Sequence, residues 1–446
     1  MKQIGKRLFT EYGMVFVLLL LCAFFSITTI SEQSPVGEAA ADLVAAEIGD
    51  RVEDSPGVFI AAGNLPEDAL FVDKLKKLLS GMDARVLAEV RGEPKDARDA
   101  LLKIVALGEK IDIIAGTPTA GDWLVFKDLE TDFPTLGEPR VIKPGSYRWP
   151  NFLKSDNLLN IANQIAVIAI MAIGMTMVIL TGGIDLSVGS LLALSAVLAT
   201  TCIRDFAGGV TAGAEGMILS SLGAILICGA VGAFSGLMIT RFGIPPFIVT
   251  LAVMLVGSGL AYLLAEGQSI YQLPDSFTRL GREADLFRFP NAVLLMLVLY
   301  AVAHLLMTRM IPGRYLYAVG GNPVTARLSG IPVKRVIVFA YFMSALLAGL
   351  GGVIMASQLK SGSPTYGNMY ELYVIAAVVV GGTSLSGGQG NMIGTLIGAF
   401  TIAVIQNGMN LTNVESYTQK VVLGTVILGA VFIDKMRNGR RSGITV

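Results

Sequence analysis

Very few side chains within the apolar stretches of this 446-residue sequence could carry chemistry. Asp185 is the most conspicuous, because it lies in Thr181–Ser190 (TGGIDLSVGS), a polar interruption between apolar runs. A carboxylate deep in an apolar region is costly unless donors surround it, and such residues often mark a solute path. Asp185 and Ser187 are therefore candidates for a translocation path or gate. The structural alternative is that the adjacent glycines allow a turn and that Asp185 caps the next helix.

Two further segments contribute candidates of the same kind. Gly381–Gly390 (GGTSLSGGQG) repeats the pattern of a glycine pair followed by hydroxyl residues, and paired interrupted helices are typical of transporters with internal repeats. Irregular backbone within a membrane must be enclosed by protein or line a water-filled cavity, so Thr383 and Ser384 join the path candidates. In GIPPFIVTL, two prolines fix the entry to an apolar run. Phe247 and Thr250 follow these prolines, and their side chains either face the translocation path or serve only in helix packing.

The sequence lacks the patterns of common catalytic and nucleotide sites. It contains no G-x-x-x-x-G-K-[ST] loop, no H-E-x-x-H and no nucleophile–base constellation. His304 stands alone in an apolar run, where a packed or hydrogen-bonded side chain is a simpler interpretation than a metal ligand. We therefore expect that the chain is not an enzyme and holds no metal or cofactor. Any energy for its function must then come from a partner.

The elements that position these residues are membrane spans. The sequence is 53% hydrophobic and 15% charged, against about 25% charged in ordinary soluble domains. The net charge of zero gives no reason to expect a nucleic-acid partner. Runs long enough to cross roughly 30 Å of hydrocarbon occur at 12–30, 157–180, 184–203, 217–240, 245–265, 291–309, 336–357, 371–386, 390–411 and 417–434.

The predicted fold is an all-α polytopic membrane protein with about ten transmembrane helices, broken helices and an internal repeat, plus a small extracytoplasmic α/β insert. Cytoplasmic loops are enriched in Lys and Arg, which here crowd residues 309–335 and the C-terminus and, as Lys2, Lys6 and Arg7, precede the first run. Ten spans place all three regions on one side, so both termini are predicted to be cytoplasmic.

The chain divides into four predicted parts: a transmembrane anchor helix at 1–31, the insert at 32–148, a transmembrane domain at 149–434 and a cytoplasmic basic tail at 435–446. The first run is long for a signal peptide, and no A-x-A site follows it directly. In the insert, strands are predicted at 57–61, 85–90 and 111–115, with a helix at 95–107 and a capping box at Asn64 and Glu67. The insert is either structural or serves in docking a binding protein or sensing a ligand.

Four motifs in order make the sequence resemble a known family. They are TGGIDLSVGS, GIPPFIVTL, the stretch from AVGGNP to ARLSGI at 318–331, and GGTSLSGGQG. The chain resembles the permeases of ribose, arabinose, xylose and galactose ABC importers over about residues 150–434 and the first span. The resemblance implies two permease copies, ATP-binding subunits that carry ATP and Mg, and a periplasmic binding protein that delivers a monosaccharide.

The resemblance also implies an ATPase-coupling loop between the sixth and seventh spans. Asn322 and Pro323 suit a helix cap and first helical residue, and Gly330 suits a helix end. Ala326 and Gly330 match the spacing of small residues in the coupling motif, and Arg327 would pair with an acidic rim. The alternative is a basic loop that only sets topology.

Together these observations predict the permease subunit of an ABC importer in the bacterial cytoplasmic (inner) membrane. It would translocate a monosaccharide, either a ribose-like pentose or a hexose. The competing hypothesis is an ion-coupled secondary transporter of small polar solutes, which would need several ionisable residues within the membrane.

Overall fold

The computed structural model describes residues 2–50, 55–286 and 288–439. The chain forms two compact units, one of residues 1–29 and 151–446 and the other of residues 30–150. Several positions used to predict the orientation lie outside the described part, namely residues 440–446 and the side chains of Lys2, Lys6, Arg7, Lys435 and Arg437.

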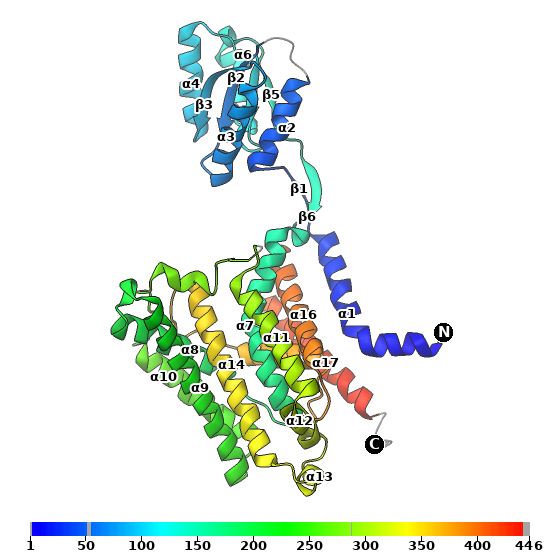
Figure 1. The fold of residues 1–446 in the computed structure, drawn as a ribbon. Helices are drawn as coiled ribbons and strands as arrows, with labels where there is room; N and C mark the ends of the chain where they lie inside the picture. Colours follow the sequence, from blue (N-terminus) through cyan, green and yellow to red (C-terminus); the bar gives the residue numbers. More distant parts are fainter. Residues whose placement is uncertain (1, 51–54, 287, 440–446) are drawn as a thin grey trace. The chain divides into compact units, whose positions relative to one another are not determined.

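The larger unit is built from long apolar helices (Figure 1). Seven of the described helices are long and apolar enough to cross a membrane: α7 (Ser155–Leu180), α8 (Val188–Phe206), α9 (Ala214–Phe242), α10 (Pro246–Leu264), α11 (Asn291–Arg309), α14 (Val333–Leu359) and α16 (Met392–Leu411). Shorter apolar stretches lie in α1 (Lys2–Thr28), α15 (Tyr370–Val380) and α17 (Ser416–Gly439). The larger unit is therefore all-α and makes the chain a polytopic membrane protein, while the count of ten spans stays a prediction.

Helix α14 is the central packing element, because it contacts α7, α8 and α9. Close approach depends on glycine at these contacts. A Cβ atom at Gly352 would lie 2.3 Å from the carbonyl oxygen of Leu192 in α8, and one at Gly174 would lie 2.5 Å from the Cα atom of Ser344. Small residues allow such backbone contact in lipid, where apolar burial drives helix association only weakly.

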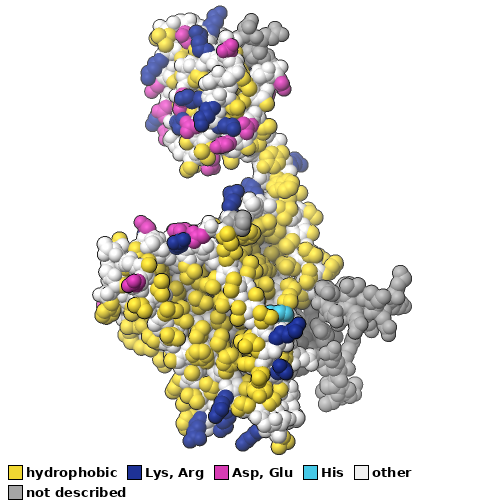
Figure 2. Space-filling model, viewed as in Figure 1, with side chains coloured by type: hydrophobic (Ala, Val, Ile, Leu, Met, Phe, Trp, Pro, Cys, Tyr) yellow, Lys and Arg dark blue, Asp and Glu magenta, His cyan; other side chains and the backbone are white. Residues whose placement is uncertain are grey.

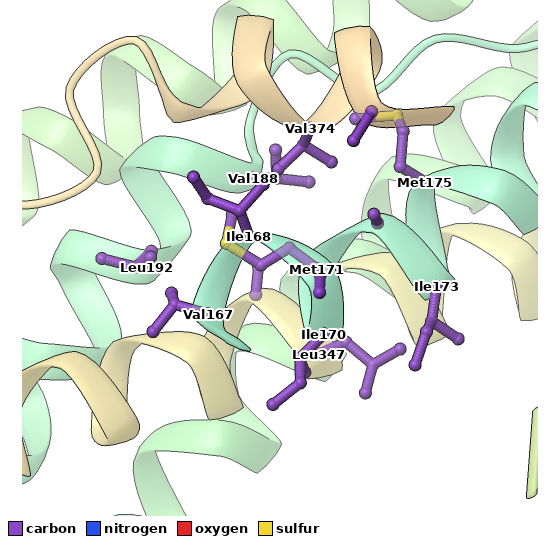
Figure 3. Close-up of a cluster of buried hydrophobic side chains, with 14 of the residues drawn as sticks. Val167, Ile168, Ile170, Met171, Ile173, Met175, Val188, Leu192, Leu347 and Val374 are labelled. Atoms are coloured by element: carbon purple, nitrogen blue, oxygen red, sulfur yellow. The ribbon is translucent and has the colours of Figure 1, made fainter. Parts of the chain in front are cut away.

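Large apolar side chains fill the space between these helices. Figure 3 shows Met171 of α7 beside Val188 of α8 and Val374 of α15, with Leu347 of α14 on the other side of α7. All four side chains are at most 4% exposed. This core fixes the positions at which α7 ends and α8 begins, on either side of the first interruption.

The smaller unit contains a four-stranded parallel sheet in the order β3-β2-β4-β5. Its strands are β2 (Gly57–Ala62), β3 (Arg85–Arg91), β4 (Ile113–Gly116) and β5 (Arg140–Ile142). Alternate residues of β2 face opposite sides: Ile60 joins a cluster with Phe71 of α3 (Pro66–Ser80), and Phe59 joins one with Leu101 of α4 (Pro94–Leu107). Helix α2 (Gly37–Gly49) covers the same face as α3. Both faces of the sheet are therefore buried.

Three details of this unit differ from expectation. The predicted capping box at Asn64 and Glu67 is wrong, because α3 begins at Pro66 and the side chain of Asp68 accepts the Leu65 N–H at 3.2 Å. Strand β4 begins at Ile113, two residues later than predicted. Finally, β1 (Ile30–Gln33) pairs in antiparallel register with β6 (Tyr147–Pro150), a ribbon that joins the two ends of the unit.

Candidate functional site

The first interruption connects α7 to α8 and places Asp185 in the protein interior. Asp185 is 1% exposed. Its Oδ1 atom accepts hydrogen bonds from the Ser187 N–H at 3.0 Å and the Ser187 hydroxyl at 2.6 Å. Its Oδ2 atom accepts one from the Ser344 hydroxyl of α14 at 2.8 Å. Both carboxylate oxygens thus have donors, which offsets the cost of burying the group.

The predicted helix cap at Asp185 is wrong in position, because Ser187 is the residue that precedes α8. The carboxylate still accepts a backbone N–H, two residues along the chain, as Asp commonly does in turns. Its third bond ties the loop to α14. This geometry favours the structural interpretation of Asp185, and a role in the path stays a prediction.

Other side chains close around the same loop. The Tyr341 hydroxyl of α14 and the Thr250 hydroxyl of α10 each lie 3.4 Å from the Ile184 carbonyl oxygen. Thr250 is fully buried and bonds the Pro246 carbonyl within its own helix at 3.0 Å. Phe247 is 54% exposed on α10. The structure therefore brings Thr250 together with the first interruption and leaves Phe247 at the surface.

The second interruption lies between α15 and α16. Helix α15 stops at Val380, so the predicted run of 371–386 was too long; Gly382, at φ +90°, adopts a backbone conformation that ends a helix readily. Thr383 and Ser384 are both buried. Among the described residues, the Thr383 hydroxyl has no hydrogen-bond partner. The chain re-enters a helix at Asn391, whose side chain accepts the Gly394 N–H at 2.6 Å.

The two interruptions meet at helix α12 (Ile311–Gly321). The Gly388 N–H donates to the Leu180 carbonyl at 2.9 Å. Gly320 packs so closely on this pair that a Cβ atom would lie 1.7 Å from the same carbonyl oxygen. The Tyr317 hydroxyl also donates to the Gly390 carbonyl at 2.8 Å. We call this three-way contact the glycine junction; sequence reasoning missed Tyr317, which lies one helical turn before the Gly320–Gly321 pair.

The predicted coupling segment forms helix α13 (Pro323–Leu328). The Asn322 side chain accepts the N–H groups of Val324 and Thr325, both at 3.0 Å, with Pro323 as the first helical residue. Ala326 is buried, whereas Val324 is 68% and Leu328 is 84% exposed. Two large apolar side chains on a six-residue helix therefore face away from the chain. Arg327 is exposed as well, and Gly330 at φ +83° follows the helix end.

A cavity of about 290 Å³ lies between α8, α10 and residues 364–371. It combines hydroxyl, amide, carboxylate and aromatic groups in its lining, from Ser190, Ser258, Tyr262, Thr365, Asn368 and Glu371. These groups match a solute rich in hydroxyls, because aromatic faces contact its carbon skeleton while polar groups exchange hydrogen bonds. Sequence reasoning did not find this cavity, since its residues come from three distant segments and only the one with Ser190 belongs to a recognised motif.

Comparison with known proteins identifies the family. Residues 157–431, more than half of the chain, match the family described as branched-chain amino acid transport system / permease component. Ribose import permease protein RbsC of Escherichia coli K12 is 41% identical over 298 residues, which is 65% of this chain and 88% of that protein. The chain belongs to the sugar ABC importer permease family. The expected resemblance is confirmed.

Further relatives of this permease family name different sugars. RbsC of Bacillus subtilis 168 is 44% identical over 291 residues, covering 65% of this chain and 88% of its own length. L-arabinose ABC transporter permease protein AraH of Azospirillum brasilense is 33% identical over 298 residues, covering 67% and 85%. No solved structure matches the chain. The chain is thus a multi-pass transport subunit, and residues 30–150 lie outside the region that matches the family.

Proposed function

We propose that this permease translocates a monosaccharide, a ribose-like pentose or a hexose, delivered by a periplasmic sugar-binding protein. A separate ABC ATPase supplies the energy and carries the ATP and Mg, and this chain has no ATPase site of its own. A second copy of the chain completes the pathway. The named sugars of the relatives and the hydroxyl-rich cavity support the substrate class.

The observation that carries the proposal is helix α13. The Asn322 cap fixes the start of this helix, and the small side chain of Ala326 is buried. Val324 and Leu328 face outward and form an apolar surface beside Arg327. Exposed apolar residues grouped in this way mark a binding surface for another protein. A cleft in an ATPase, with an acidic rim, would accept the apolar surface of Val324 and Leu328 and pair with Arg327.

Ion coupling is less well supported. Among the Asp, Glu, Lys, Arg and His side chains described in the transmembrane unit, Asp185 is the one that is buried, and its oxygens accept three hydrogen bonds from Ser187 and Ser344. A carboxylate engaged in this way holds a loop in place. A proton or sodium relay would need further ionisable groups along the path.

The proposed location is the cytoplasmic (inner) membrane with both termini in the cytoplasm. This orientation puts α13 and the basic loop at 309–335 inside, and it puts the unit of residues 30–150 outside. There the unit has access to the binding protein, which supports a docking role over a purely structural one.

The test is reconstitution of the chain with a candidate ATPase in liposomes. ATP hydrolysis should rise when binding protein and sugar are both present, and labelled sugar should accumulate only with ATP. Sugar uptake by the chain alone, driven by an ion gradient, would overturn the proposal.

A further inference from the structure

A groove between α9 and α14 has no part in the function proposed above. It lies where α9 ends and α14 begins and has a volume of about 490 Å³. Leu237, Phe339 and Phe342 contribute apolar surface to it. Figure 2 shows Lys and Arg side chains gathered at the lower end of the helical unit. Three such cations, Arg241, Lys334 and Arg335, line the same groove.

These three cations lack acidic partners among the described residues. No ion pair or side-chain hydrogen bond in that part of the chain involves Arg241, Lys334 or Arg335. All three residues are exposed. Three like charges around one groove repel one another, so an anion bound there would relieve that repulsion.

The helix ends set the depth of each group in the bilayer. Arg241 is the next-to-last residue of α9, and Lys334 and Arg335 follow the first residue of α14. The cations therefore lie at the level of the lipid headgroups. Leu237 is four residues from Arg241, about 6 Å along the axis, and Phe342 is seven residues from Arg335, about 10 Å along. The apolar surface thus lies at the depth of the acyl chains.

The start of α14 adds to the attraction for an anion. A helix N-terminus carries a partial positive charge, so Lys334 and Arg335 in the first turn oppose the helix dipole. The unfavourable interaction of these two cations with the helix dipole is offset if a negative group binds between them. The two side chains and Arg241 of α9 then act on the same ligand.

We propose that this groove is a binding site for an anionic phospholipid, with its phosphate at Arg241, Lys334 and Arg335 and an acyl chain along Leu237, Phe339 and Phe342. Basic pockets between transmembrane helices are known to recognise anionic headgroups. A zwitterionic lipid would bring its own ammonium group to three unpaired cations. An ATPase outside the bilayer could not fill surface at the depth of Phe342.

The test titrates the purified full-length chain with phosphatidylglycerol and with phosphatidylcholine and measures bound lipid by native mass spectrometry. The wild-type chain should prefer phosphatidylglycerol. The triple variant R241Q/K334Q/R335Q should lose roughly a hundredfold of this preference, since each cation near the surface contributes about a fivefold preference. A wild-type chain without preference for phosphatidylglycerol would overturn the site.

Two controls separate a built site from general charge attraction. The variant R309Q/R314Q/K420Q removes the same charge from exposed positions that do not line the groove, and it should retain the preference. An equal loss in both triple variants would refute the proposal. If the groove triple variant fails to fold, L237W serves instead: Leu237 is 50% exposed, and the indole should occupy the acyl-chain surface and weaken phosphatidylglycerol binding while all charges remain. Unchanged binding in L237W would count against the site.

Discussion

The glycine junction makes a sharp prediction for Gly320→Ala. The added Cβ would lie 1.7 Å from the Leu180 carbonyl oxygen and 2.5 Å from the Gly388 nitrogen. Both neighbours are backbone atoms, so no side-chain rotation relieves the contact. Overpacking typically costs about 1–3 kcal/mol, and loss of the hydrogen bond from Gly388 to Leu180 adds about 1 kcal/mol. Alanine regains about 1 kcal/mol of helix propensity, which leaves a net destabilisation of about 1–3 kcal/mol.

The assay is thermal unfolding of the purified chain in detergent, followed by size-exclusion chromatography. For a large domain a loss of about 1–3 kcal/mol corresponds to a fall in Tm of about 2–12 °C. Gly321→Ala is the matched control, because it lies on the same helix and its Cβ would meet no atom within 4 Å. That variant should be as stable as the wild type or slightly more so. Equal stability of Gly320→Ala and Gly321→Ala would refute the reasoning.

Three further predictions concern the loop that carries Asp185, helix α13 and the insert. Ser344→Ala removes a donor from buried Asp185 and should cost about 1–3 kcal/mol, measured as a lower Tm. Gly330→Asp adds a charge after α13 where a Cβ meets no neighbour; at φ +83° the strain should cost only about 1–2 kcal/mol, so the chain should fold but lose sugar-stimulated ATP hydrolysis by the partner, and unchanged stimulation would exclude α13 from coupling. In the insert, a hydrogen bond from Lys76 lowers the pKa of Glu89, so this carboxylate stabilises the fold above its unfolded pKa and the stabilisation is lost as pH falls through the lower folded value. Glu89→Gln should therefore weaken hydrogen-exchange protection of β3 at pH 7 and have little effect near pH 3, and an equal effect at both pH values would contradict this account.

The sequence was sufficient for features that are local or periodic. Apolar runs located the helices of the transmembrane unit, and the Asn322–Pro323 pair located the cap of α13, because one side chain and its own backbone make that bond. Glycine pairs located both interruptions. The position of α13 therefore followed from neighbours in the chain.

Contacts between distant segments could not be predicted in the same way. Ser344 is an ordinary small residue in an apolar helix until α14 is placed beside Asp185, 159 positions away in the sequence. Gly320, Leu180 and Gly388 meet through backbone atoms, which leave no mark on residue type beyond the glycines themselves. The misplaced cap at Asp185 has a different, local cause, because a turn and a helix start both suit a short carboxylate.

The ribbon of β1 and β6 has a consequence for how the chain folds. Bringing together the ends of a flexible loop of about 120 residues costs about 4 kcal/mol of entropy. Here Ile30 pairs with Pro150 within a unit that has its own buried clusters, so a folded insert presents its two ends side by side, as a short hairpin would. The entropy cost of bringing α1 and α7 together is therefore incurred when the insert folds, and not when the membrane helices assemble. The membrane helices can assemble as though α1 and α7 were consecutive, and an insert of different size or sequence could occupy the same position without altering their assembly.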